Sequence, residues 1–97
     1  MDSKITNLIQ LCIKAGKVSK GDRLIPSIQK GQAKLIIVSN SCGKNTLKKI
    51  QDKCTYYHIP YFLVESDILK NVSYSKLSAI AILDDGFAKA ILNKLKG

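Results

Sequence analysis

Residues 35–64 read LIIVSNSCGKNTLKKIQDKCTYYHIPYFLV, and this stretch decides the fold. Its first four residues form a continuous apolar, largely β-branched run, which is typical of a strand buried on both faces. A polar segment leads into a helix that Pro60 stops, and residues 61–64 form a second short apolar strand. The predicted inward stripe of the helix is Leu47, Ile50, Cys54 and Tyr57. The stretch therefore predicts a strand, a helix and a second strand in succession.

The sequence before this stretch continues the alternation. Apolar residues at helical spacing mark a helix over residues 5–13, which Gly16 ends as a left-handed cap. A short extended piece follows at residues 17–19. A turn at residues 21–22 then leads into a second helix, which Gly31 closes.

The sequence after it adds one more strand and two helices. The Ser-Asp pair at 66–67 is placed to cap a short helix, and residues 71–76 read as a loop. Residues 78–83 form a further apolar run. The Asp-Asp pair at 84–85 begins a last helix, where negative charge suits the helix dipole. Strands separated by helices indicate an α/β protein with a mostly parallel sheet, a three-layer α/β/α sandwich formed by a single domain over residues 1–97.

The net charge of the chain is +9 and is unevenly distributed. Residues 1–53 hold 11 basic and 3 acidic side chains, whereas residues 54–97 hold 5 and 4. Such one-sided charge indicates a polyanionic partner, with nucleic acid first. The three cysteines are an odd number at irregular spacing, which favours a reducing cytoplasm over a disulfide framework. Because the chain shows neither a run of about 18 apolar residues nor a signal-peptide pattern, we expect a cytoplasmic protein.

Four segments in order carry a resemblance to a known family. They are Gly16-Lys17-Val18 with Gly21, Gly31-Gln32-Ala33-Lys34-Leu35, residues 45–54 (NTLKKIQDKC) and Asp84-Asp85-Gly86-Phe87-Ala88. Residues 45–54 are the most specific of them. Over residues 5–95 the chain resembles the YlxQ-type bacterial branch of the L7Ae/L30e superfamily of ribosomal proteins. This resemblance implies an α/β/α sandwich with a mixed sheet of about four strands and about five helices.

The resemblance also implies binding to RNA kink-turns, which are helix–bulge–helix elements with tandem sheared G·A pairs and a sharp bend. The implied RNA-binding residues are Lys17, Ser19, Lys20, Gly21, Asp22 and Arg23, which face the G·A pairs, and Val72, Ser73, Tyr74 and Ser75, which cover the extruded bulge nucleotide. We therefore expect a non-enzymatic, monomeric protein that has structured RNA as its partner, is associated with the ribosome or translation, and needs no cofactor.

These residue types suit contacts to folded RNA. A helix opening offers free N–H groups to phosphate, and Gly21 allows close approach of the backbone. Lysine side chains neutralise phosphates, and Arg23 can form two hydrogen bonds to a guanine edge. Tyr74 can stack on an unstacked base. Asp22-Arg23 stands where the family commonly has an amide beside an acid or a second amide, and Pro26 or Ser27 stands where it has a lysine.

Other patterns have plainer explanations. Cys54 and His58 have the i, i+4 spacing of metal ligands, but no nearby pair completes four ligands. The Gly-Lys pair at 43–44 lacks the rest of a phosphate loop. The Asp-Asp pair at 84–85 has no accompanying nucleophile or base, so a structural role at the helix start explains it better than catalysis. Of the adjacent tyrosines Tyr56 and Tyr57, we expect one in the core and one exposed at a protein contact.

Two rival functions remain at this point. One is a protein-interaction module of the same fold that docks on the ribosome or on translation factors without reading RNA sequence. The other is a small nucleotide-binding enzyme, for which the sequence supplies no good site. The lysines on the outer face of the central helix, Lys44, Lys48, Lys49 and Lys53, either are solvated or extend the RNA surface.

Overall fold

The computed structural model describes residues 3–40, 42–65 and 78–96. The described elements are α1 (Ser3–Lys14), β1 (Val18–Lys20), the 3-10 helix η1 (Gly21–Arg23), α2 (Leu24–Gln29), β2 (Leu35–Ser39), α3 (Lys44–Tyr57), β3 (Tyr61–Val64), β4 (Ala79–Ile82) and α5 (Asp85–Lys96). The strand–helix–strand unit predicted from residues 35–64 is confirmed as β2, α3 and β3. The helix expected after residues 66–67 and the loop at 71–76 lie outside the described residues.

The four strands form one mixed sheet in the order β1-β4-β2-β3. Strands β2 and β3 are parallel, whereas β4 is antiparallel to both β1 and β2. The mixed sheet that the resemblance implied is thus confirmed, and the mostly parallel sheet expected from alternation alone is wrong. Strands β1, β2 and β3 run in one direction, but β4 lies between β1 and β2 and runs in the opposite direction. The order of the elements along the chain does not determine this position of β4.

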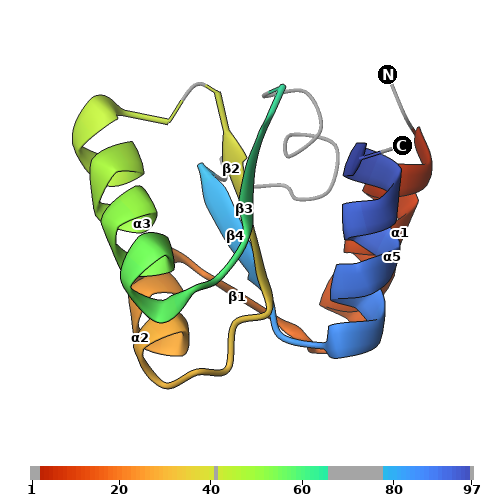
Figure 1. Ribbon diagram of the computed structural model, residues 1–97. Coiled ribbons are helices and arrows are strands. Elements are labelled where there is room, and N and C mark those ends of the chain that lie inside the picture. The colour runs from red at the N-terminus through yellow and green to blue at the C-terminus, as the bar shows by residue number, and fades with distance from the viewer. Residues whose placement is uncertain (1–2, 41, 66–77, 97) are drawn as a thin grey trace.

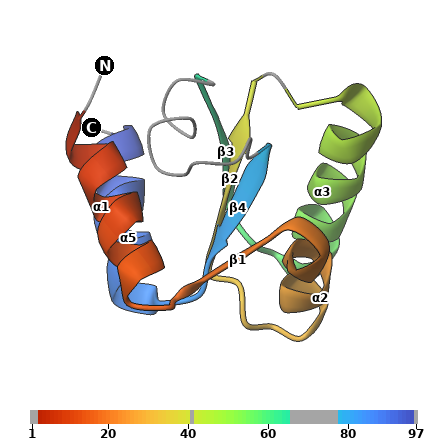
Figure 2. The same cartoon turned by 180° about the vertical axis from the view of Figure 1, so that it is seen from behind.

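Helices cover both faces of the sheet, with α1 and α5 on one side and α2 and α3 on the other (Figures 1 and 2). Successive residues of β2 point to alternate sides, so Leu35 and Ile37 pack in the α1–α5 core while Ile36 and Val38 pack in the α2–α3 core. All five residues of β2 are buried, as the continuous apolar run predicts. The three-layer sandwich is therefore confirmed.

Three of the helix ends are set by residues in left-handed conformation, and one of these, Gly31 with φ +73°, closes α2 as predicted. At the end of α1, Gly16 has φ +71°, and the Lys17 N–H donates to the Cys12 carbonyl at 3.0 Å, as predicted for this glycine. At the end of α3 the same role falls to His58, with φ +59°, and the Ile59 N–H donates to the Cys54 carbonyl at 2.9 Å. The helix ends three residues before Pro60, in agreement with the prediction, and these bonds fix the residue at which it ends.

The tyrosines at the end of α3 are both exposed. Tyr56 is 75% exposed and Tyr57 is 37% exposed, so the inward position predicted for Tyr57 is wrong. The stripe that faces the sheet consists of Leu47, Ile50 and Cys54. Tyr57 is the last residue of α3, where the helix has passed the core and lies near α2 (Figure 1).

Candidate nucleic-acid interface

The first predicted contact region is an exposed corner where β1 becomes η1. Lys20 is extended, with φ −148° and ψ 167°, and Gly21 then takes φ +60° to start the turn. Lys20, Gly21, Asp22 and Arg23 are all exposed. Since an L side chain rarely adopts this φ, the glycine is what allows the strand to enter the 3-10 turn here.

The corner lies beside the start of β4. Lys20 is opposite Ile80 in the β1–β4 pairing, and Ser78 lies at the same end of β4. A hollow of about 130 Å³, which we call the corner hollow, is lined by Gly21, Leu24, Ile25, Thr46, Lys49, Ile50, Ser78 and Ala79. The second predicted region, Val72, Ser73, Tyr74 and Ser75, lies outside the described residues.

Ser19 and Arg23 lie at a different hollow. Its volume is about 370 Å³, and it is lined by Gly16, Val18, Ser19, Arg23, Pro26, Ser27, Lys30, Gln32 and Leu83. Within the first region, Gly21 therefore lies at the hollow beside Ser78, whereas Ser19 and Arg23 lie at the hollow beside α2. The two cations Arg23 and Lys30 line the second hollow together, which makes it suited to an anionic group.

Lys17 is separated from the corner by the length of β1. Its backbone carbonyl accepts a hydrogen bond from the Leu83 N–H at 2.8 Å, at the other end of the β1–β4 pairing. Four residues of strand place it ~13 Å from Gly21. The pKa of the Cys12 thiol is raised to about 11, mainly by burial and to a smaller extent by the Asp84 carboxylate. Lys17 acts in the opposite direction, so the charges of Asp84 and Lys17 both lie near this thiol.

Ser27 and Pro26 have structural roles in α2. The Ser27 side chain is buried, and its hydroxyl donates to the Leu24 carbonyl at 2.6 Å. Pro26 is the third residue of α2, where a backbone N–H has no partner within the helix, so the proline does not break it. The helix begins after a 3-10 turn and is only six residues long. The Ser27 hydroxyl proton is therefore already used within α2, and little of this side chain is exposed at the hollow.

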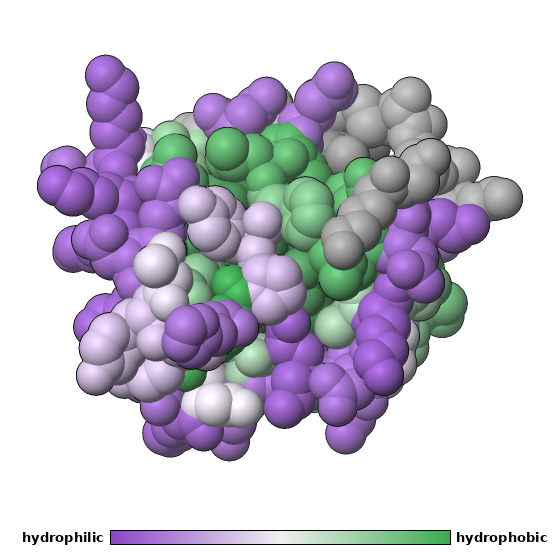
Figure 3. All heavy atoms as spheres, viewed as in Figure 1, coloured by the Kyte–Doolittle hydropathy of each residue, from purple (hydrophilic) through white to green (hydrophobic). Residues whose placement is uncertain are grey.

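Positive charge is concentrated on the part of the chain that forms this interface. Residues 17–60 hold nine basic side chains and two acidic ones, Asp22 and Asp52. In Figure 3, hydrophilic side chains project along the side of the molecule occupied by α3. The structure adds Thr46 and Lys49 to the site, which the sequence reasoning did not place beside Gly21. Only the packing of α3 against η1 and α2 brings them there.

The described residues contain no metal site and no membrane span. No group of three or more His, Cys, Asp or Glu side chains within residues 3–40, 42–65 and 78–96 is arranged to hold a metal ion. Cys54 is buried, and burial raises the pKa of its thiol to about 11, whereas His58 is exposed. Among the described helices, none is long and apolar enough to cross a bilayer.

The family model of the ribosomal protein L7Ae/L30e/S12e/Gadd45 family matches residues 3–92. The chain belongs to this family. Within it, the RNA-binding protein YlxQ of Enterococcus faecium is 36% identical over 97 residues, covering 97% of this chain and 93% of that protein. The RNA-binding protein YlxQ of Bacillus subtilis (strain 168) is 37% identical over 91 residues and covers 91% of each. The resemblance to the YlxQ-type branch is thus confirmed.

A solved structure supports the fold of this L7Ae-family chain. A protein of unknown function from Bacillus halodurans C superposes with a TM-score of 0.91 and is 27% identical. The match covers 99% of this chain and 100% of that one.

Proposed function

We propose that the protein is a non-enzymatic RNA-binding protein that recognises kink-turn-like structured RNA and is associated with the ribosome or translation. The observation that carries the proposal is the exposed turn at residues 20–23, where Lys20 and Arg23 outnumber Asp22 and Gly21 lines the same hollow as Ser78. Two relatives that cover more than nine-tenths of the chain are RNA-binding proteins, which supports RNA as the partner. The concentration of positive charge over residues 17–60 supports contact with a phosphate backbone.

The residues of the corner would divide the work of recognition. Lys20 neutralises a phosphate, and Arg23 hydrogen-bonds a guanine edge with two N–H groups. Asp22 accepts a hydrogen bond from a guanine amino group. Lys17, at the far end of β1, makes at most a peripheral phosphate contact. Because the bent RNA alone fits both regions, binding stabilises the bent form over extended ones.

The second contact region would complete the site. Val72, Ser73, Tyr74 and Ser75 precede Ser78 by only a few residues, and Ser78 lies at the corner hollow with Gly21. A tyrosine delivered there can stack on an extruded base, which is how proteins commonly read splayed RNA. We propose that these four residues cover the bulge nucleotide.

A titration with a kink-turn RNA at two salt concentrations tests the proposal. The control RNA has the same stems without the tandem G·A pairs. We expect tighter binding to the kink-turn at both salt concentrations. Equal binding would leave the basic surface as a docking surface for ribosome or translation factors, without specific RNA recognition.

The role of Arg23 has its own test. We expect Arg23→Ala to cost ~1–3 kcal/mol of binding free energy on the kink-turn and little on the control RNA. Isothermal titration calorimetry with both RNAs measures the difference. An identical loss on both RNAs would show that Arg23 contacts only phosphate.

A further inference from the structure

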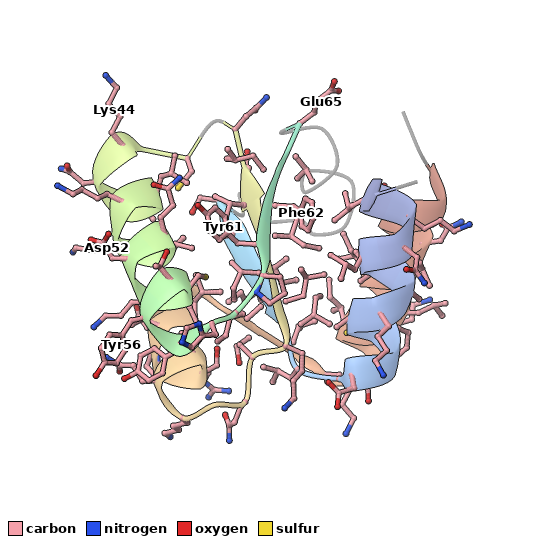
Figure 4. The ribbon with its side chains drawn as sticks, in the orientation of Figure 1. Lys44, Asp52, Tyr56, Tyr61, Phe62 and Glu65 are labelled. Carbon is pink, nitrogen blue, oxygen red and sulfur yellow. The ribbon has the colours of Figure 1, made fainter. Side chains whose placement is uncertain are left out.

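A separate hollow between α2 and α3 is lined by aromatic and cationic side chains. Its volume is about 640 Å³, and its lining residues are Ile25, Lys49, Asp52, Lys53, Tyr56 and Tyr57, which we call the α2–α3 groove. Figure 4 shows Asp52 and Tyr56 on the side of α3 that faces away from the sheet. The groove is thus an outer surface of the molecule, and Ile25 at its base packs against the α2–α3 core.

Tyr56 presents an aromatic ring to solvent beside the ring of Tyr57. Its side chain is 75% exposed, although tyrosine rings usually bury much of their area. The ring centroids of Tyr56 and Tyr57 are 4.8 Å apart with an interplanar angle of 76°, an edge-to-face contact. This contact leaves most of the Tyr56 side chain exposed, so its ring is accessible to a ligand.

The cations of the groove follow the same stripe of α3. Lys49, Lys53 and Tyr56 are spaced i, i+4 and i+7, which places them on one side of a helix over ~10 Å. Asp52 is the one acidic residue among those that line the groove. A row of cations ending in an exposed aromatic ring is the combination with which proteins bind single-stranded nucleic acid, because bases stack and phosphates are neutralised.

The groove is continuous with the proposed RNA interface. Lys49 lines both the α2–α3 groove and the corner hollow that contains Gly21 and Ser78. Ile25 of α2 lines both as well. An RNA strand leaving the corner therefore has a cationic path along α3 toward Tyr56.

We infer that the α2–α3 groove binds an unpaired nucleotide flanking the folded RNA element, with its base stacked on Tyr56 and its phosphates at Lys49 and Lys53. This inference rests on the proposed function and extends it to a second contact. The exposed Tyr56 ring favours RNA over an acidic protein segment as the occupant, because every nucleotide offers a base face that can stack on it while the lysines bind its phosphates. The groove would thus bind the strand without reading its sequence.

A set of kink-turn RNAs with and without overhangs tests the inference. A kink-turn assembled from two strands has four ends, and each end in turn receives a short unpaired extension. We expect one extension to tighten binding by about fivefold to a hundredfold over the blunt RNA, the range for stacking one base. Tyr56→Ala should abolish this gain and Tyr56→Phe should retain it. A 4-thiouridine in that extension should crosslink to residues 49–57, as read by mass spectrometry.

Matched controls separate this contact from the main one. Lys53→Ala should reduce the gain from the extension, whereas Lys94→Ala, which removes an exposed lysine from α5, should leave it unchanged. Arg23→Ala should weaken the blunt and extended RNAs equally. If no extension tightens binding, or if the gain survives Tyr56→Ala, the inference is overturned while the proposed function stands. If the blunt kink-turn binds no better than its control RNA, the proposed function itself fails.

Discussion

At the scale of single residues, the acidic pair before α5 shows how a position decides the role of a side chain. The Asp84 carboxylate accepts a hydrogen bond from the Phe87 N–H at 2.9 Å, which is the bond of a helix N-cap. Its neighbour Asp85 is the first residue of the helix and suits the helix dipole. The structural role expected from the sequence is therefore observed.

Removal of this cap should destabilise the protein by a small amount. We expect Asp84→Ala to lower the free energy of unfolding by ~1 kcal/mol, because the Phe87 N–H loses its acceptor. Asp84→Asn keeps an acceptor oxygen and should cost less. Urea denaturation followed by circular dichroism measures both. An equal loss in the two variants would mean that the charge matters rather than the hydrogen bond.

The buried thiols should make stability depend on pH in the alkaline range. Burial raises the pKa of Cys12 and of Cys54 from 9.0 to about 11, with Asp84 adding to the rise at Cys12. Between these values the unfolded chain releases the thiol protons first. The free energy of unfolding should therefore fall as pH rises from 9 toward 11, by at most ~1.4 kcal/mol per pH unit for each thiol.

Equilibrium denaturation at a series of pH values checks this expectation. Lysine and tyrosine side chains also titrate near this range, so the comparison needs a variant without one thiol. Cys54→Ala should show a shallower fall above pH 9 than the parent protein, even though its stability is lower throughout. Identical slopes would exclude Cys54 as a source of the effect.

At the scale of elements, the burial of residues that repeat with the period of a strand or helix was predictable from the sequence. The burial of residues at helix ends and the order of the strands in the sheet were not. The apolar run at 35–38 indicated β2, because a strand buried on both faces has consecutive apolar residues. The stripe of Leu47, Ile50 and Cys54 indicated α3, because a helix buried on one side has apolar residues three or four positions apart. Tyr57 continues that stripe but lies beyond the core. The place of β4 between β1 and β2 depends on contacts between distant segments, which no local pattern records.

The end of α3 offers a test of an element boundary. His58 has φ +59°, which costs a non-glycine residue ~1–2 kcal/mol, whereas glycine adopts it freely. Glycine also gains entropy in the unfolded chain, ~0.5–1 kcal/mol. We therefore expect His58→Gly to raise the free energy of unfolding by ~0.5–1 kcal/mol. His58→Ala is the control, and a gain of the same size there would show that the backbone conformation is not the cause.

At the scale of the whole molecule, the sheet decides which charges can act together. The family resemblance implied that Lys17 and Arg23 belong to one contact region. Strand β1 separates them, with Lys17 beside Leu83 and Gly21 beside Ser78. Conversely, Lys49 joins the corner although it is far from it in sequence. The turn at Gly21 was predictable from the sequence, whereas the hollows that are assembled across elements required the fold.

The salt dependence of RNA binding should distinguish Lys20, at the corner, from Lys17, at the other end of β1. Each phosphate neutralised contributes a slope of about −0.7 to −0.9 to the plot of log K against log salt concentration. Lys20→Ala should make the slope shallower by about 1, since this exposed lysine adjoins the turn at Gly21. Lys17→Ala should change the slope less, because Lys17 lies at the other end of β1, near the Cys12 thiol that Asp84 also influences.

Fluorescence anisotropy with a labelled kink-turn between about 50 and 200 mM salt measures the slopes of the parent protein and of both variants. A larger change for Lys17→Ala than for Lys20→Ala would place the RNA at the α1–α5 end of the sheet and contradict the corner as the point of contact.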